Sequence, residues 1–359
     1  MNKKIIFSTG GTGGHIFPAL NLMKHFSEKG HEVLIVTDKK GKEFIKDYSQ
    51  FKSYILNTET FTNKGIVKKF LSLFIILFAI VKSIIILKKE KPNIIFGFGG
   101  YVSFPISFAS RFFKLPLIIY ENNIIIGRAN KYLLSFSKKI LLAKSLNKKM
   151  SQKIKKKINL VGSILNKKII NFDASTKKKN EILFSLLVLG GSQGAEFFGK
   201  IVPPVVKKIK DLGYEIEINQ QCKADQKDIL VDFYNKNNIK NYVFEFDNDI
   251  IKLTSSSNLA IARCGASTTA ELVHTLTPFI GIPLPNSIDN HQYLNAEYYK
   301  NKGCCWVLDQ ESLSIENLFN LILEIIKDKN KLISIENNMK NNSSKNVYSN
   351  IENALKDFI

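Results

Sequence analysis

A short apolar run, a loop of four glycines and an amphipathic segment follow one another in residues 5–19. We interpret them as a buried strand, a tight loop and a helix with Pro18 in its first turn. Glycine lets the backbone bend sharply and bring several N–H groups against one ligand, and the helix N-terminus adds a partial positive charge. The unit is therefore suited to binding an anion such as a phosphate or a diphosphate.

The glycine loop differs from both common phosphate-binding motifs. No Gly-Lys-Ser/Thr closes it as in a P-loop, and His15 follows the fourth glycine, which departs from the dinucleotide fingerprint. A tight strand-to-helix turn without a ligand is the alternative interpretation. His15 favours a ligand site because it puts a titratable side chain where the anion would lie.

Composition indicates a folded protein. A chain of 359 residues with 45% hydrophobic and 11% aromatic content is long enough for two domains, each with its own core. The net charge of +21 suggests nucleic acid, anionic lipid or an anionic substrate as a partner, or only a bias toward lysine and asparagine. The four cysteines lack metal-ligand spacing and are expected to be reduced thiols in a cytosolic protein. The N-terminus does not read as a signal peptide.

Strand and helix patterns alternate through the first half of the chain. A second strand, residues 31–37, completes a βαβ unit, which predicts a parallel sheet with ligands at the carboxyl ends of its strands. Residues 92–105 repeat the opening pattern with Ser103 as a possible helix N-cap, so a second glycine turn is expected to narrow the same site. The strand at 115–123 ends in Glu121 and Asn123, which suit either a ligand site or ordinary turn chemistry.

The apolar segment 70–87 has lysines on both sides. As a helix it would be about 27 Å long, just short of the hydrocarbon thickness of a bilayer. Lys82 disfavours a membrane span, because a central lysine costs about 3 kcal/mol on insertion scales. Length alone does not exclude a span, but two compatible interpretations are preferred: a helix buried against the sheet, or a helix that offers one face to the membrane interface.

The architecture starts again in the second half. A strand and a glycine loop recur at 181–195, about 180 residues after the first pair, which predicts two similar α/β domains in tandem. We expect an N-terminal domain at 1–162, a C-terminal domain at 163–346, and a final helix at 347–358 that docks back on the first domain. Two anion-binding domains facing each other across a cleft would suit two phosphorylated ligands.

The segment after the strand at 259–262 carries the next candidate site. Small residues at 264–270 open a helix, so that backbone N–H groups can approach a diphosphate, and Glu271 can accept hydrogen bonds from ribose hydroxyls. Asp289, Gln292 and Asn295 are three residues apart and are expected on one helical face. That face would either read sugar hydroxyls or be a solvated surface.

Six motifs, taken together, resemble the MurG family, the undecaprenyl-diphospho-muramoylpentapeptide β-N-acetylglucosaminyltransferases of peptidoglycan synthesis. They run in family order over nearly the whole chain, at residues 10–18, 97–103, 121–123, 190–195, 263–268 and 289–296. The resemblance implies a GT-B fold of the α/β class, with two Rossmann-like domains facing each other across a cleft. It also implies an inverting transfer, without metal or other cofactor, of GlcNAc from UDP-GlcNAc to the C4 hydroxyl of the muramoyl sugar of lipid I, which gives lipid II.

The resemblance assigns roles by position. The donor-binding residues would be Thr12, Gly13, Gly14, Asn123, Ser192, Ala266, Ser267, Thr268, Thr269, Ala270, Glu271 and Gln292. The residues at the acceptor diphosphate would be Gly13, Gly14, Gly99, Gly100, Tyr101 and Ser103. His15 is our candidate for the base or for a group that orients the acceptor, because a helix N-terminus disfavours its protonated form; a structural cap is the alternative. The membrane-facing residues would be Lys68, Lys69, Phe70, Phe74, Leu77 and Phe78.

Two positions depart from the family pattern. Tyr120-Glu121-Asn122-Asn123 stands where the family has His-Glu-Gln-Asn, and Asn166 stands at the position of an arginine that often helps to hold the donor. Lys167 or Lys168 could supply a point charge there but not a bidentate fork, which puts donor affinity in question.

The expected partners are UDP-GlcNAc, lipid I and an anionic membrane surface, with no nucleic acid, at the cytoplasmic face of a bacterial plasma membrane. The alternatives are a related transferase acting on another lipid such as diacylglycerol, a basic nucleic-acid-binding protein, and a dinucleotide-dependent oxidoreductase.

Overall fold

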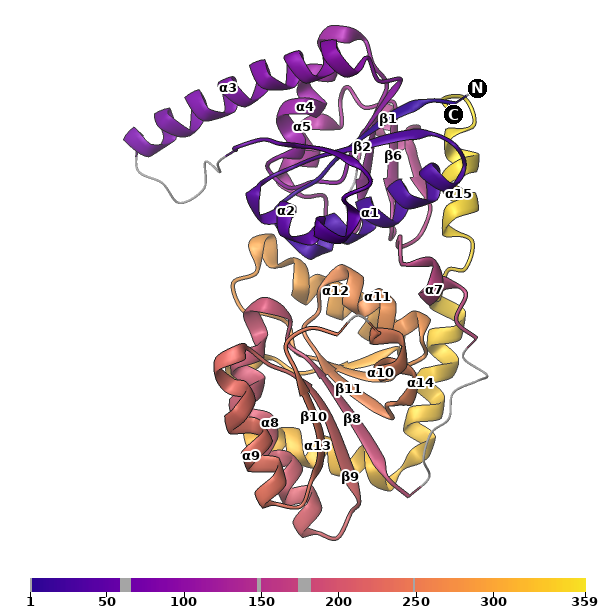
Figure 1. Cartoon of the computed structure of the whole chain (residues 1–359). Coiled ribbons are helices and arrows are strands. Elements are labelled where there is room, and N and C mark those ends of the chain that lie inside the picture. The colour runs from indigo at the N-terminus through magenta and orange to yellow at the C-terminus, as the bar shows by residue number, and fades with distance from the viewer. Residues whose placement is uncertain (1, 59–65, 147–149, 174–181, 248) are drawn as a thin grey trace. The chain divides into compact units, whose positions relative to one another are not determined.

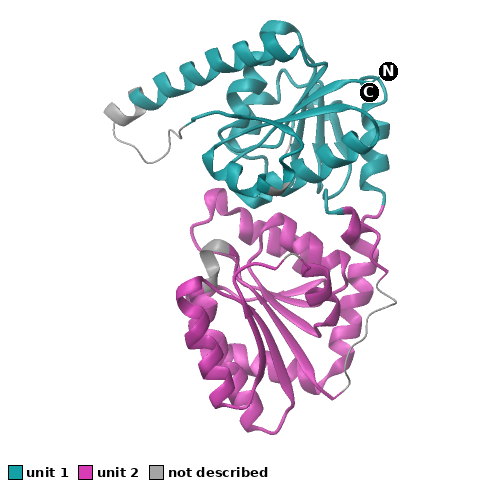
Figure 2. Cartoon of the chain, viewed as in Figure 1, with its two compact units in different colours: residues 1–166, 346–359 teal, residues 167–345 magenta. Residues whose placement is uncertain are grey.

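The computed structural model describes residues 2–58, 66–146, 150–173, 182–247 and 249–359, with the backbone alone at 47, 66–70 and 192–195. The chain forms two compact units (Figures 1 and 2). The first unit contains residues 1–166 together with Asn346–Ile359, and the second contains Lys167–Lys345. Each unit is a parallel sheet with helices on both faces, as the alternation of strands and helices predicts.

The sheet of the first unit has seven parallel strands in the order β3-β2-β1-β4-β5-β6-β7. Its strands are β1 Lys4–Ser8, β2 Glu32–Thr37, β3 Lys52–Ile55, β4 Ile94–Gly97, β5 Leu117–Glu121, β6 Lys139–Leu142 and β7 Ile158–Leu160. Its helices are α1 Gly13–Glu28, α2 Lys39–Phe44, α3 Ile66–Glu90, α4 Ser103–Ala109, α5 Arg128–Leu133, α6 Gln152–Lys155 and α15 Val347–Leu355.

The sheet of the second unit has six parallel strands in the order β10-β9-β8-β11-β12-β13. Its strands are β8 Phe184–Leu189, β9 Ile216–Gln221, β10 Lys240–Phe244, β11 Leu259–Ala262, β12 Phe279–Gly281 and β13 Cys305–Val307. Its helices are α7 Lys167–Ile170, α8 Gly191–Asp211, α9 Lys227–Lys236, α10 Ile250–Ser256, α11 Ala266–His274, α12 His291–Lys300, α13 Ile315–Lys327 and α14 Lys329–Asn342.

The central strand β8 shows why these sheets are covered on both faces. Leu186 and Val188 pack into a core shared with α8, α9 and α13. Leu187 and Leu189 point the other way, into a core shared with α10, α11 and α14. Because residues 186–189 of β8 are all apolar and successive side chains point to opposite faces, the strand can be buried only between two layers of helices, which gives the three-layer arrangement.

Helix α15, the last of the chain, packs on the first unit. The Tyr348 hydroxyl donates to the Leu165 carbonyl at 2.7 Å, and Asn350 Nδ2 donates to the Val161 carbonyl at 3.3 Å. Glu352 Oε1 lies 2.6 Å from Nε2 of His25, a buried residue of α1. The segment before the boundary and the final helix are thus tied to each other.

Two local expectations about helix starts are wrong. Helix α1 begins at Gly13, so Pro18 lies in its second turn rather than its first, and the last two glycines of the loop belong to the helix. Ser103 is not the N-cap of α4; Val102 holds that position, and the buried Ser103 hydroxyl donates to the Gly100 carbonyl at 2.9 Å.

Candidate functional site

The two glycine turns of the first unit lie against each other. Strands β1 and β4 are neighbours, so the loops that follow them share one edge of the sheet. At Gly100, where φ is +77°, an added Cβ would lie 2.5 Å from the carbonyl oxygen of Gly10. Only glycine allows this approach, and the expectation that a second glycine turn narrows the site is confirmed.

In the first glycine loop, some backbone N–H groups already have a hydrogen-bond acceptor and others are available to a ligand. Gly11 N donates to Oδ2 of Asp38 at 3.2 Å, and the other oxygen of that carboxylate caps α2. Gly13 and Gly14, at the start of α1, have no hydrogen-bond acceptor for their N–H groups among the described residues. Thr12 is the exposed N-cap and makes no side-chain cap. An anion at this helix start therefore meets Gly13 and Gly14 rather than Gly11.

Asp38 was not among the sequence candidates. It follows strand β2 directly, at the carboxyl end where polar side chains of a parallel sheet gather. That position is the signal that could have identified it.

His15 lies in the first turn of α1 and contacts the second glycine loop. A Cβ at Gly99 would be 3.2 Å from both Nδ1 and Cε1 of the half-buried His15 ring. The imidazole is thus held between the helix start and the turn that carries Gly99, Gly100 and the half-buried Tyr101. The ring therefore lies beside the start of α1, where the sequence predicts a group that handles a proton.

Glu121 organises the loop after β5. Its buried carboxylate accepts hydrogen bonds from the backbone N–H and Nδ2 of Asn123, both at 3.1 Å, from Gly127 N at 2.9 Å and from Asn130 Nδ2 at 3.0 Å. These contacts fit the turn-chemistry interpretation of Glu121. Asn123, a predicted donor contact, is half-buried and is oriented by the same carboxylate.

Tyr120, which replaces the family histidine, connects this loop to α1. Its hydroxyl accepts from Ile164 N at 3.0 Å and lies 3.0 Å from Asn122 Oδ1. Asn122 Nδ2 in turn donates to the Gly14 carbonyl at 3.4 Å. Complete burial raises the pKa of Tyr120, which keeps its proton and acts as a structural donor.

The second unit presents a helix start of the expected kind. Helix α11 begins after Gly265, which provides no side-chain cap, so the positive end of the helix dipole is left for an anion. Ser267 and Thr268 are half-buried, whereas Ala266, Thr269 and Ala270 are buried. The Thr269 hydroxyl donates to the Gly265 carbonyl at 3.0 Å, so this side chain is turned into its own helix.

Glu271 is half-buried, and its carboxylate has no hydrogen-bond partner within the part of the chain that the structure describes. Burial raises the pKa of Glu271 to about 7. A desolvated carboxylate with open acceptor positions is suited to bind a pair of hydroxyl donors.

The side chain of Gln292 is held by the backbone N–H groups of two other residues. Its Oε1 accepts from Cys264 N at 3.2 Å and from Leu284 N at 3.0 Å, which leaves the amide N–H groups to donate to a ligand. Asn295 is buried and its Nδ2 donates to the Cys264 carbonyl at 3.2 Å. Asp289 does not share their helical face, because it precedes α12 and has a φ of +52°; that prediction is wrong.

Ser192 lies at the start of α8, whose backbone alone is described there. The residue before it, Gly191, donates its N–H to Gln221 Oε1 at 2.9 Å. Among the described residues, no group of three or more His, Cys, Asp or Glu side chains could hold a metal ion.

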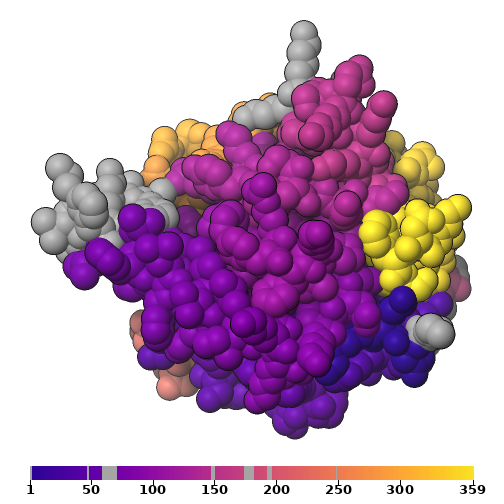
Figure 3. Space-filling model, turned by 90° about the horizontal axis from the view of Figure 1, so that it is seen from above, coloured from indigo at the N-terminus to yellow at the C-terminus, as the bar shows by residue number. Residues whose placement is uncertain are grey.

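Helix α3 carries an exposed apolar face. Within the described residues it is long and apolar enough, from Leu71 to Glu90, to cross a membrane by length and composition, and 28% of that window is buried. The exposed side chains include the predicted Phe74, Leu77 and Phe78, whereas the predicted Lys68, Lys69 and Phe70 have backbone positions only. Figure 3 shows atoms of this part of the chain, in purple, at the surface of the molecule.

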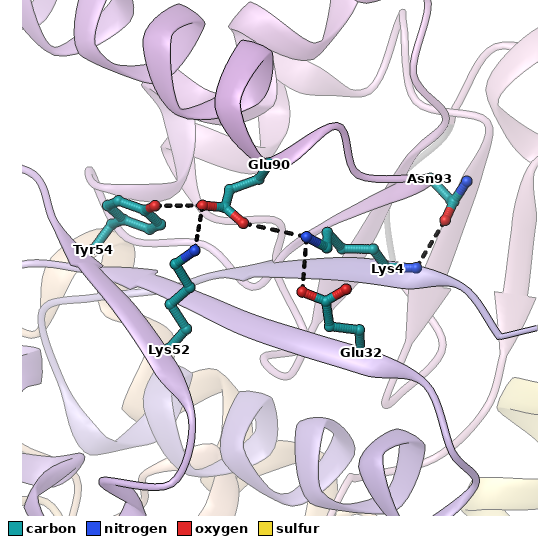
Figure 4. Close-up of polar contacts among 6 residues, drawn as sticks. All are labelled: Lys4, Glu32, Lys52, Tyr54, Glu90 and Asn93. Atoms are coloured by element: carbon teal, nitrogen blue, oxygen red, sulfur yellow. Dashed lines mark hydrogen bonds and ion pairs between the residues drawn. The ribbon is translucent and has the colours of Figure 1, made fainter.

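The C-terminal end of α3 is anchored by the buried carboxylate of Glu90 (Figure 4). Glu90 forms ion pairs with Lys52 at 2.7 Å and Lys4 at 3.3 Å and accepts a hydrogen bond from Tyr54. Burial alone would raise its pKa, but these three partners outweigh burial and hold the pKa of Glu90 at about 2. The exposed apolar face is therefore carried on a helix whose C-terminal end is fixed to β1 and β3.

Family models match both units: the glycosyltransferase family 28 N-terminal domain at residues 5–142 and the C-terminal domain of the same family at residues 185–354. The chain is 34% identical over 351 residues to a UDP-N-acetylglucosamine–N-acetylmuramyl-(pentapeptide) pyrophosphoryl-undecaprenol N-acetylglucosamine transferase of Pelagibacter ubique, covering 98% of this chain and 97% of the relative. It is 36% identical over 347 residues to the transferase of the same name from Rickettsia felis, covering 94% of each.

A solved structure has the same fold. The crystal structure of Acinetobacter baumannii MurG superposes with a TM-score of 0.81 at 23% identity, covering 99% of this chain and all of that one. The likeness confirms the predicted arrangement of two parallel-sheet α/β domains. With near-complete coverage of relatives above 30% identity, the chain belongs to glycosyltransferase family 28 and, within it, to the MurG family.

Proposed function

We propose that this protein transfers GlcNAc from UDP-GlcNAc to the C4 hydroxyl of the muramoyl sugar of lipid I, forming lipid II. The observation that carries the proposal is a sequence identity of 34% and 36%, over nearly the full length of the chain, to two transferases named for this reaction. The available N–H groups of Gly13 and Gly14 and the start of α11 support it, because both substrates carry a diphosphate.

The direct test is transfer of radiolabelled GlcNAc to purified lipid I in detergent micelles, compared with diacylglycerol and with micelles alone. We expect labelled product with lipid I only. Transfer to diacylglycerol but not to lipid I would assign the chain to the other lipid acceptor. Binding of nucleic acid that UDP-GlcNAc does not displace, without transfer, would favour the nucleic-acid alternative.

The proposed reaction is a single displacement with inversion. The acceptor C4 oxygen attacks the anomeric carbon of GlcNAc, the bond from that carbon to the diphosphate oxygen breaks, and UDP leaves with the electron pair. His15 accepts the hydroxyl proton, and the positive end of α11 stabilises the charge that develops on UDP.

We infer that helix starts and backbone N–H groups take the place of a metal ion in stabilising the leaving diphosphate. EDTA is therefore expected to leave the rate of transfer largely intact, measured at saturating concentrations of both substrates. A loss of activity that Mg²⁺ or Mn²⁺ restores would contradict the inference.

Glu271→Ala is expected to raise the KM for UDP-GlcNAc about tenfold or more, because hydrogen bonds to a charged carboxylate contribute about 1.5–3 kcal/mol each. Ribose hydroxyls donate to the ionised form, so donor affinity should rise with pH between 6 and 8, where this carboxyl ionises. Isothermal titration calorimetry across that range checks both expectations.

The Glu271→Gln variant provides the control. A carboxyl with a raised folded-state pKa stabilises the fold at low pH and loses that contribution as pH rises through 7. The Gln variant should therefore gain stability over the parent at pH 8 and lose the pH dependence of donor binding. An unchanged KM in Glu271→Ala would remove Glu271 from the ribose site.

We infer that the exposed face of α3 contacts an anionic membrane surface and the lipid part of the acceptor, as a peripheral attachment. Phe74 is 67% exposed and Phe78 is 62% exposed, and Lys82 lies over the Phe78 ring at 4.9 Å. An apolar stripe with a lysine beside it is typical of helices that lie in the headgroup region.

The double variant Phe74→Asp, Phe78→Asp is expected to weaken binding to anionic vesicles by about tenfold or more, because burying one Phe contributes about 1.5–3 kcal/mol. Flotation with vesicles containing phosphatidylglycerol measures this. Ile229→Asp is the matched control, since Ile229 is 70% exposed on α9 of the second unit. Flotation of the double variant equal to that of the parent would refute the role of α3.

A further inference from the structure

Arg263 is one of the few arginines in a chain whose basic residues are almost all lysines. The 52 lysines and arginines include three arginines, Arg111, Arg128 and Arg263. Arg263 follows strand β11 directly and precedes the turn into α11. It is 6% exposed, although a buried guanidinium is costly unless its N–H groups are bonded.

The guanidinium binds two neighbouring carbonyls and one side chain. Its Nη1 donates to the carbonyls of Ile282 at 3.0 Å and Pro283 at 3.1 Å, and its Nη2 donates to Gln310 Oε1 at 2.5 Å. Its central carbon lies 4.8 Å from the ring centre of Phe198 and 5.3 Å from that of Phe197, both on α8. Arg263 thus joins β11, the segment after β12, the 3₁₀ turn Gln310–Ser312 and α8.

The segment held by Arg263, residues 282–292, needs such an attachment. Asn286, Asp289 and Asn290 all have φ between +52° and +58°, a conformation that costs free energy for residues other than glycine. Its first residues are bound by Arg263, and its last, Gln292, bonds back to Leu284 N and Cys264 N. Both ends of the segment 282–292 are therefore attached to residues 263–264, which follow β11 directly.

The contacts of Arg263 require the planar, forked geometry of a guanidinium group. Its three acceptors are two carbonyls and one amide oxygen, reached from two nitrogens of one planar group. A lysine ammonium would keep the charge but could not reproduce that geometry. Burial lowers the pKa of Arg263 to about 10, so the guanidinium stays charged at neutral pH.

We propose that Arg263 is a positioning residue that fixes residues 282–292 and thereby holds Gln292 with its amide N–H groups available to the sugar of the nucleotide-sugar donor. This inference rests on the proposed function. It assigns to Arg263 the discrimination between UDP-GlcNAc and UDP, since the hydrogen bonds of the Arg263 side chain reach Ile282, Pro283 and Gln310 rather than Glu271 or α11, which are proposed to bind the nucleotide part.

The test compares two ligands on one variant. Arg263→Lys is expected to weaken UDP-GlcNAc binding about fivefold or more, while UDP binding changes much less, because the proposed hydrogen bonds from the Gln292 amide go to the sugar, which UDP lacks. The KM for UDP-GlcNAc should rise more than kcat falls. Calorimetric titration with each nucleotide and initial rates supply these quantities.

Two further variants keep the test decisive. Gln310→Ala removes one acceptor from a surface turn and should give a smaller loss with the same selectivity, even if Arg263→Lys folds poorly. Arg111→Lys, at an exposed arginine of the first unit, should change neither affinity. Equal losses for UDP and UDP-GlcNAc in both test variants, or no loss in either, would overturn the proposal. Failure of the parent to bind UDP-GlcNAc would instead contradict the proposed function.

Discussion

His15→Ala is expected to lower kcat for GlcNAc transfer by about 10²- to 10⁴-fold, the range typical of a missing general base. The imidazole is held between the start of α1 and Gly99, and in the proposed reaction it takes the proton of the attacking hydroxyl. The expected losses lie in the chemical step, so donor affinity should change little. Single-turnover rates with both substrates saturating separate chemistry from binding.

A matched control is available on another histidine of the same unit. His31 follows α1, and its Nδ1 accepts from Lys3 N at 3.1 Å, away from the glycine loops. His31→Ala should keep the kcat of the parent. Near-normal turnover by His15→Ala under saturating conditions would show that His15 orients or caps rather than accepts the proton.

Gly100→Ala is expected to lower both activity and stability. The added methyl group would lie 2.5 Å from the Gly10 carbonyl oxygen, and the backbone there has a φ of +77°. A non-glycine residue in that conformation costs about 1–3 kcal/mol, and the contact adds to it because neither backbone can move without displacing a glycine loop. Thermal unfolding and transfer rates measure the two losses.

Gly30→Ala separates the two causes. Gly30 has a φ of +86° in the same unit, but its added methyl group would meet only the Asn2 side chain at 3.6 Å, an ordinary contact. It should lose stability through its backbone alone and keep its kcat. If Gly100→Ala lost no more stability than Gly30→Ala and kept its activity, the close approach of the two loops would contribute neither to stability nor to activity.

The glycine loops could be predicted because their cause is local. A short apolar run such as Ile5 to Phe7 followed by a glycine loop predicts a buried strand, and a parallel sheet brings the ends of neighbouring strands to one edge. Glu121 was ambiguous for a physical reason: carboxylates that organise a turn and carboxylates that bind a ligand occupy the same position after a strand.

Other features depend on contacts that spacing does not encode. Asp289 leaves the helical register because Asp289 and Asn290 adopt left-handed backbone angles, and a three-residue spacing predicts a shared face only within a continuous helix. Arg263 and Asp38 acquire their roles from partners on other strands and loops. The position of Asp38 after β2 marks it as a candidate, but its partner and the partners of Arg263 could be assigned only once the order of strands was known.

The division of the chain has a consequence for its synthesis. The second unit is one continuous stretch, whereas the first is assembled from both ends, with Val347, Ile351 and Leu355 of α15 fully buried in it. On the ribosome, the later unit can complete its core while the earlier one still waits for its last helix. Nascent chains that stop short of α15 would therefore leave an apolar surface uncovered on the part made first.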